Sequence, residues 1–297
     1  MIEVKNITKK YGKNIAIENI DFSIKPGTIY GLIGYNGAGK TTLLKTISGI
    51  YIPEEGAVYI KGEPLYKNLE IKKEIYLLSE EPFFLPQSNL YKMKKFYKGY
   101  YKKWDDRIFE NLTNLFNLDL HKNIDEFSKG MKRQAGLIIA LSTLPKYLFL
   151  DEAFDGLDLS KRNLMKNLLR DYVKNKNATV VVTSHNLQEL EDISDSIGMI
   201  QNKKMIFSGS CDEVRKSCNK YKISLKEDID FEELDLKIYG FKKEEGKITF
   251  IVREKSEEVL KMLYKFNPTK IEVLPTSLEE VFLSEKEEVS YEFKDIF

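Results

Sequence analysis

Cysteine is almost absent from this sequence, whose 297 residues include only Cys211 and Cys218. The spacing of these two residues matches neither a metal-binding nor a redox-active cysteine pair. So few cysteines also exclude a small secreted scaffold held together by disulfides, and they indicate a reducing compartment. We therefore expect both cysteines to act as ordinary small side chains.

Long apolar runs are missing as well. The best candidate, Leu137 to Leu150, is interrupted by Pro145 and Lys146, whereas a membrane helix needs about 20 apolar residues. The N-terminal stretch Met1-Ile2-Glu3-Val4-Lys5 lacks the apolar region of a signal peptide. We expect a soluble, cytoplasmic protein, so any role at a membrane requires another chain.

The sequence has no marked excess of charge of either sign. It contains 47 basic and 46 acidic residues, which gives a net charge of +1. This balance gives no reason to expect a nucleic-acid partner. A chain of 297 residues is long enough for one large domain and a smaller one.

The most informative stretch is a glycine-rich segment, residues 34–41, which matches the phosphate-loop pattern G-x-x-x-x-G-K-[ST]. A predicted buried strand precedes it and a predicted helix follows. Glycines let successive backbone N–H groups turn toward a polyphosphate, and the helix N-terminus adds a positive dipole end. Lys40 would contact the β- and γ-phosphates, and the Thr41 hydroxyl would bind Mg²⁺.

The alternative for this segment is a glycine-rich surface turn with an exposed lysine. A chance match in a chain of this length has odds of about one in a hundred, and the flanking strand and helix lower them further. We therefore predict a nucleoside triphosphate site. Its phosphate loop comprises Gly34, Asn36, Gly37, Ala38, Gly39, Lys40, Thr41 and Thr42.

Two carboxylates follow a second apolar strand. Residues 147–150 form a continuous apolar run that ends in Asp151 and Glu152. A buried parallel strand delivers such groups to a phosphate site at its carboxyl end. Asp151 would hold Mg²⁺ through water, and Glu152 would activate the attacking water. The alternative, a strand end with two solvated acids, is disfavoured by the upstream phosphate loop.

Four further residues have weak signals when taken alone. Tyr11, in a turn ahead of the phosphate loop, could stack on a purine base or could be a surface tyrosine. Ser128 and Gly130 begin a predicted helix and could bind an anion, although a plain N-cap is the simpler interpretation. His185 follows the predicted strand 179–183 and could equally be a capping residue.

The rest of the pattern predicts the architecture. Residues 2–25 alternate as antiparallel strands, and a helical region occupies about 85–140. Within that region an apolar stripe recurs at helical spacing, which indicates a core-facing stripe, or alternatively a partner or membrane surface, beside a face of lysines. The stripe consists of Leu90, Met93, Tyr97, Tyr100 and Trp104.

A boundary is expected near residues 208–219, followed by a small α+β accessory domain. Its predicted strands cover 221–225, 236–241, 248–252 and 270–274, and its predicted helices cover 257–266 and 278–284. Ser277 and Glu280 form a capping-box pattern at the start of the last helix.

The order and spacing of these motifs over about residues 1–210 resemble the ATP-binding subunits of ABC transporters. In that resemblance Tyr11 is the adenine-stacking residue, Glu80 takes the glutamine-loop position, and His185 is the switch histidine. Residues 127–131 are the signature motif, and Asp158 belongs to the D-loop. The resemblance implies that Glu152 and His185 are catalytic and that Thr41, Glu80 and Asp151 surround Mg²⁺.

The implied fold is α/β: a phosphate-loop core with an antiparallel β-subdomain and a helical subdomain over residues 1–210, plus an α+β domain over 211–297. The resemblance also implies a head-to-tail homodimer or heterodimer, in which Ser128 and Gly130 face the ATP of the other subunit. A separate transmembrane permease would hold the pair at the inner face of the cell membrane. No nucleic acid is expected.

Three segments resemble bacterial exporters of antibiotics, peptides and similar compounds: Ser-Lys-Gly-Met-Lys, Ser-Glu-Glu-Pro and Ser-Leu-Glu-Glu-Val-Phe. The alternative is a soluble ABC ATPase acting on ribosomes or nucleic acid. The ribosomal kind resembles two such domains in one chain, and the DNA-repair kind carries long coiled coils or zinc cysteines; this sequence has neither. Two departures from the family pattern stand out. Lys129 replaces a glycine and Met131 a glutamine in the signature, and Glu80 (or Glu81) replaces the loop glutamine.

Overall fold

A computed structural model describes residues 1–224, 237–244, 247–253 and 256–284. The chain divides into two compact units, Met1–Gly209 and Ser210–Phe297. No helix in the described ranges is long and apolar enough to cross a membrane.

The first unit is built on a six-stranded sheet with the order β10-β9-β3-β8-β7-β6. Its strands are β3 (Ile29–Ile33), β6 (Ile75–Leu78), β7 (Tyr147–Leu150), β8 (Thr179–Ser184), β9 (Ser196–Gln201) and β10 (Lys204–Ser210). The five strands from β9 to β6 are parallel to one another. Every residue of β3, β7 and β8 is buried, as expected for continuous apolar runs covered on both faces.

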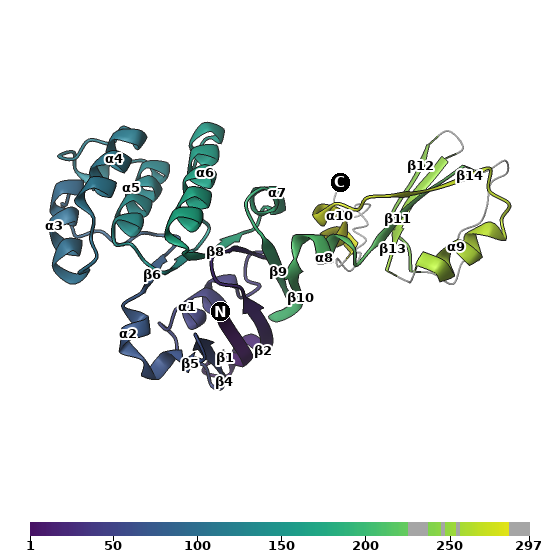
Figure 1. The fold of residues 1–297 in the computed structure, drawn as a ribbon, viewed down its shortest axis with the longest axis horizontal. Coiled ribbons are helices and arrows are strands. Elements are labelled where there is room, and N and C mark those ends of the chain that lie inside the picture. The colour runs from purple at the N-terminus through teal and green to yellow at the C-terminus, as the bar shows by residue number, and fades with distance from the viewer. Residues whose placement is uncertain (225–236, 245–246, 254–255, 285–297) are drawn as a thin grey trace, which may run out of the picture. The chain divides into compact units, whose positions relative to one another are not determined.

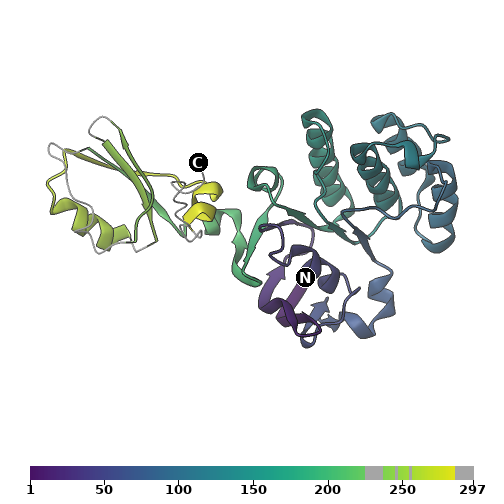
Figure 2. The ribbon, with the colours of Figure 1, turned by 180° about the vertical axis from the view of Figure 1, so that it is seen from behind.

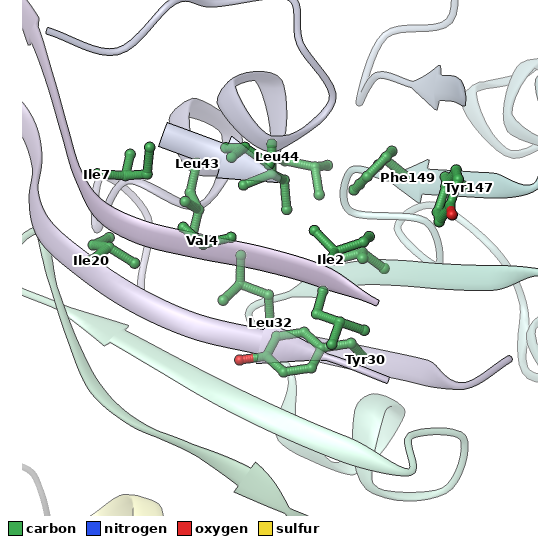
Figure 3. Close-up of a cluster of buried hydrophobic side chains, with 14 of the residues drawn as sticks. Ile2, Val4, Ile7, Ile20, Tyr30, Leu32, Leu43, Leu44, Tyr147 and Phe149 are labelled. Atoms are coloured by element: carbon green, nitrogen blue, oxygen red, sulfur yellow. The ribbon is translucent and has the colours of Figure 1, made fainter. Parts of the chain in front are cut away.

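An antiparallel sheet with the order β2-β1-β4-β5 forms a second layer. Its strands are β1 (Ile2–Tyr11), β2 (Asn14–Ile24), β4 (Glu55–Ile60) and β5 (Glu63–Pro64). Figure 3 shows its inward residues Val4 and Ile20 packed against Leu43 and Leu44 of helix α1 (Lys40–Ile47) and Leu32 of β3. The α/β class and the antiparallel β-subdomain predicted from the sequence are confirmed.

Helices α3 (Leu90–Tyr100), α4 (Asp106–Phe116) and α5 (Lys129–Ser142) gather at the end of this unit remote from β1 and β2 (Figures 1 and 2). They form the predicted helical subdomain. The remaining helices are η1 (Leu65–Lys67), α2 (Leu69–Lys72), η2 (Ile124–Glu126), α6 (Leu159–Lys176) and α7 (Leu187–Glu191).

The apolar stripe predicted to face the core does so only in its first half. Leu90 and Met93 are fully buried, but Tyr100 is 74% exposed. Helix α3 ends at Tyr100, and the next residue, Tyr101, has an extended backbone conformation. Trp104 therefore lies beyond the helix. Tyr97 and Trp104 are half-buried, so within the stripe Tyr100 is the residue that presents most of its surface to solvent.

The second unit contains an antiparallel sheet with the order β12-β13-β11-β14. Its elements are α8 (Cys211–Arg215), β11 (Asn219–Ser224), β12 (Tyr239–Glu244), β13 (Lys247–Val252), α9 (Ser256–Tyr264), β14 (Lys270–Leu274) and α10 (Leu278–Ser284). Val259 and Leu263 of α9 pack on Tyr221 and Phe250 of the sheet. The predicted capping box is present, since Glu280 N–H donates to Ser277 Oγ at 3.2 Å and Ser277 N–H donates to Glu280 Oε2 at 3.0 Å.

The strand predicted over 236–241 is wrong in its bounds. The observed strand is β12, which includes Gly240 at a φ of 57° and an irregular register between Tyr239 and Lys242. This bulge breaks the alternation from which the strand was predicted. Leu225 and Leu236, at the ends of two predicted strands, lie outside the described residues.

Candidate nucleotide site

The glycine-rich loop connects β3 to α1 in the conformation that a phosphate loop needs. Gly37 and Gly39 have φ values of 80° and 110°, a region that other residues rarely adopt. A Cβ at Gly39 would lie 2.5 Å from Ile17 Cγ2 and 2.7 Å from the Ala16 carbonyl oxygen. Gly39 also precedes the first turn of α1 without a capping side chain, so the positive end of the helix is open to an anion.

Lys40, Glu152 and His185 form a continuous polar chain across the ends of three strands. Lys40 is 6% exposed, and its Nζ donates to the Gly34 carbonyl at 2.6 Å. The same nitrogen lies 3.1 Å from Glu152 Oε1. The other Glu152 oxygen lies 3.0 Å from His185 Nδ1. Glu152 therefore contacts both Lys40 and His185, and all three residues were predicted as functional from the sequence.

Thr183, at the end of β8, fixes both acidic residues and was missed by the sequence analysis. Its hydroxyl donates to Asp151 Oδ1 at 2.7 Å and accepts the Glu152 N–H at 2.8 Å. Glu152 has a φ of 47°, which is costly for a residue with a side chain. Thr183 therefore stabilises the backbone that presents Glu152, while Asp151 stays buried at 2% exposure.

Arg133 of α5 was also missed. Although only 1% exposed, it donates through Nη1 to the carbonyls of Ser79 at 3.1 Å and Asp151 at 3.0 Å. It thereby ties α5 to the ends of β6 and β7. Burial lowers the pKa of Arg133, and the nearby carboxylates, Asp155 and Glu80 foremost, oppose that shift.

Lys40, Glu152 and His185 line a polar cleft of about 510 Å³ at the carboxyl ends of the parallel strands. Of the predicted site residues, it is lined by Asn36, Gly37, Gly39, Lys40, Thr41, Thr42, Glu80, Glu152 and His185. Lining residues that the sequence analysis did not single out are Ile15, Ala16, Tyr35, Asp155 and Lys203.

Other predicted residues lie outside this lining. Gly34 and Ala38 belong to the loop backbone, whose turn is closed by the Ala38 N–H donating to the Tyr35 carbonyl at 3.1 Å. Asp151 lies behind the cleft, held by Thr183. Tyr11 is 48% exposed, and its hydroxyl lies 3.4 Å from Thr42 Oγ1, so its ring is beside the loop.

Ser128 and Gly130 are not brought to the cleft of their own chain. Ser128 is exposed and caps α5 by accepting the Met131 N–H at 3.2 Å. Gly130 is buried against the turn at Gly156, where an added Cβ would lie 2.6 Å from the carbonyl oxygen. The signature segment therefore presents Ser128 outward.

The oxygen donors suit Mg²⁺, which prefers hard ligands and uses only one or two protein carboxylates beside substrate phosphates. The Thr41 hydroxyl and the carboxylates of Glu80 and Glu152 face the cleft, with Asp151 behind it. Within the described ranges no three His, Cys, Asp or Glu side chains converge as a preformed metal site. The donor set thus matches an ion that arrives together with a polyphosphate.

Comparison with known proteins gives consistent matches. The family model described as "ABC transporter" matches residues 17–155. The ABC transporter ATP-binding protein YtrB of Bacillus subtilis is 27% identical over 96% of this chain and 97% of its own. The bacitracin transport ATP-binding protein BcrA of Bacillus licheniformis is 33% identical over 74% of this chain and 73% of its own.

Among solved structures, the ATP-binding subunit of an ABC transporter superimposes with a TM-score of 0.66 at 27% identity. The match covers 73% of this chain and 92% of the other.

Proposed function

The chain belongs to the ATP-binding proteins of ABC transporters, and from this premise we propose that it powers a bacterial exporter of an antibiotic, peptide or similar compound. It is an ATPase whose activity is coupled to transport. The observation that supports the catalytic assignment best is the chain of contacts from Lys40 through Glu152 to His185 beside the phosphate loop. The named transport role of the bacitracin relative supports the exporter class.

In this proposal each group has a distinct role. Lys40 binds the β- and γ-phosphates and exchanges its contact with Glu152 for them. Glu152 then accepts the proton of the attacking water, and His185 holds the carboxylate through its second oxygen. Tyr11 stacks on the adenine beside Thr42.

Thr41, Glu80 and, through water, Asp151 would hold Mg²⁺, which neutralises charge on the phosphates when it is bound. Glu80 lines the cleft, but its Oε1 also lies 3.9 Å from Lys129 Nζ. A carboxylate at this position binds a hard cation more strongly than an amide does. It also repels the triphosphate unless the metal lies between them.

We expect Glu80→Gln to lower the Mg²⁺ dependence of ATP binding severalfold and to change basal hydrolysis only modestly, since Glu152 and His185 are untouched. Calorimetric titration of ATP at several Mg²⁺ concentrations measures this. Glu81→Gln is the matched control, because Glu81 is exposed and does not line the cleft. Superimposable curves for Glu80→Gln and the unaltered protein would remove Glu80 from the metal site.

The outward position of Ser128 supports a head-to-tail pair, with a second copy or with a homologous chain. Each ATP would lie between the phosphate loop of one subunit and the segment Ser128–Gly130 of the other. The N-terminus of α5 adds a positive dipole end toward the phosphates.

An aromatic cleft of about 990 Å³ between α2 and α3 supports docking of a permease. Of the stripe residues, the half-buried Tyr97 and the exposed Tyr100 line it. Its aromatic lining is Phe96, Tyr97, Tyr100 and Tyr101. Aromatic residues are enriched at protein interfaces, and the three tyrosines combine an apolar ring with a polar tip. We place a cytoplasmic segment of the permease here, which puts the chain on the inner face of the membrane.

Tyr100→Ala should weaken association with the permease, whereas basal ATP hydrolysis by the separate subunit should stay unchanged. If Tyr100 is a hot spot of the interface, its removal costs about 2 kcal/mol or more, about 30-fold in affinity. The measurement is co-purification with a co-expressed candidate permease from the same genome, together with ATP-driven cargo export from vesicles.

Tyr91→Ala is the control for this docking experiment, since Tyr91 is an exposed tyrosine on the same helix that does not line the aromatic cleft. Equal co-purification of Tyr100→Ala and Tyr91→Ala would exclude the cleft as the docking site. Failure of the unaltered chain to bind any membrane protein would contradict the exporter proposal itself.

A further inference from the structure

Lys129 and Glu80, which replace the usual glycine and glutamine, are close to each other in the structure. Lys129 Nζ lies 3.9 Å from Glu80 Oε1 and 2.5 Å from Asp155 Oδ2. Both acids line the nucleotide cleft of the same chain. Since Lys129 directly follows Ser128, one side chain connects the outward-facing signature segment to the cleft behind it.

The backbone around this ion pair is tightly packed. An added Cβ at Gly130 would lie 2.6 Å from the Gly156 carbonyl oxygen, so the start of α5 touches the turn after Asp155 with no side chain between them. The Cγ and Cδ of Lys129 would lie 3.4 Å from a Cβ at Gly156, so its stem covers that turn. The turn after Asp155 and the first turn of α5 are therefore in direct contact.

The ion pair contributes little to stability. The hydrogen bond from Lys129 lowers the pKa of Asp155, and the same bond raises the pKa of Lys129, so both are charged near neutral pH. The two side chains are 59% and 37% exposed. Exposed pairs stabilise a fold by about 0–1 kcal/mol, so a variant lacking the pair should still fold.

We propose that Lys129 is a positioning residue that couples the two ATP sites of the dimer. Asp155 and Glu80 move when ATP enters their own cleft, and Lys129 passes that movement to Ser128, which contacts the ATP held by the partner. The inference rests on the head-to-tail arrangement given above. Under this proposal each ATP strengthens binding at the other site, and because coupling is reciprocal the two effects are equal in size.

The test compares Lys129→Met, which keeps the stem and removes the charge, with Lys132→Met. Lys132 is a half-buried lysine on the same helix with no ion pair in the described part of the chain. We expect a Hill coefficient for ATP hydrolysis approaching about 2 in the unaltered protein and in Lys132→Met, and about 1 in Lys129→Met.

The ATP concentration that drives dimerisation is measured by ultracentrifugation in a Glu152→Gln background. This concentration should rise about 5-fold or more when Lys129→Met is added. Thermal melting should not change measurably.

Two further variants separate coupling from a purely structural role. Lys129→Arg should restore cooperativity, because a guanidinium can also pair with Asp155. Asp155→Asn should also lose cooperativity. The double variant Asp155→Asn, Lys129→Met should lose no more cooperativity than either single variant, as expected for partners in one interaction.

Unchanged cooperativity in Lys129→Met, or an equal loss in Lys132→Met, would overturn the inference while leaving the dimer intact. If the unaltered protein neither dimerises with ATP nor hydrolyses it cooperatively, the head-to-tail arrangement and the inference both fail.

Discussion

Lys40→Ala should abolish ATP binding and leave the fold intact. The Lys40 ammonium is the only side-chain cation of the phosphate loop, and it is held in place by the Gly34 carbonyl and Glu152. Each hydrogen bond from a charged group contributes about 1.5–3 kcal/mol. Losing two such bonds to phosphate therefore weakens ATP binding by at least about 100-fold.

The fold should tolerate this change because the carboxylate left behind keeps a partner. Glu152 still contacts His185, and its backbone N–H still donates to Thr183. Lys45→Ala is the control, since Lys45 is on the same helix but does not line the cleft. Calorimetry with Mg²⁺ and ATP, beside a thermal melt, measures both properties. An ATP affinity equal to that of the unaltered protein would refute the assignment.

Residues whose positions depend on local chain geometry were predictable from the sequence. A phosphate loop needs glycines, a lysine and a hydroxyl at fixed spacing between a strand and a helix. This spacing is enough to locate Gly37, Gly39 and Lys40 in the sequence. Asp151 and Glu152 follow a continuous apolar strand, which places them at the carboxyl edge of a parallel sheet. For these residues sequence spacing and spatial position carry the same information.

Residues whose roles depend on tertiary packing were not predictable. Thr183 reaches Asp151 only because β7 and β8 are neighbours in register, with Leu150 opposite Val182. In the sequence, Arg133 is indistinguishable from other polar residues of its helix. Its role is visible only in the packed structure, where it bonds to the carbonyls at the ends of β6 and β7. The contact of Lys129 with Asp155 likewise joins two segments that no local pattern relates. Only the tertiary structure shows that the departures at Glu80 and Lys129 are spatially related.

Glu152→Gln should abolish most turnover while preserving ATP binding. Glutamine has the size of glutamate and still offers an oxygen to Lys40, so the cleft keeps its shape. It cannot accept the proton of the attacking water, and a general base contributes about 10²- to 10⁴-fold to a rate. We therefore expect turnover to fall by that factor, which corresponds to about 3–5 kcal/mol of barrier, and an ATP-bound dimer to accumulate.

Single-turnover hydrolysis and ATP affinity are measured on the same preparation. Together they distinguish a slower hydrolytic step from weaker ATP binding. Glu126→Gln is the control, because Glu126 is an exposed acid that does not line the cleft. His185→Ala should also slow hydrolysis, but less than Glu152→Gln, since His185 orients the carboxylate without replacing it. Turnover by Glu152→Gln at the rate of Glu126→Gln would mean that another group activates the water. Asp155 would then be the next candidate, because it is the remaining carboxylate beside Glu80 that lines the cleft.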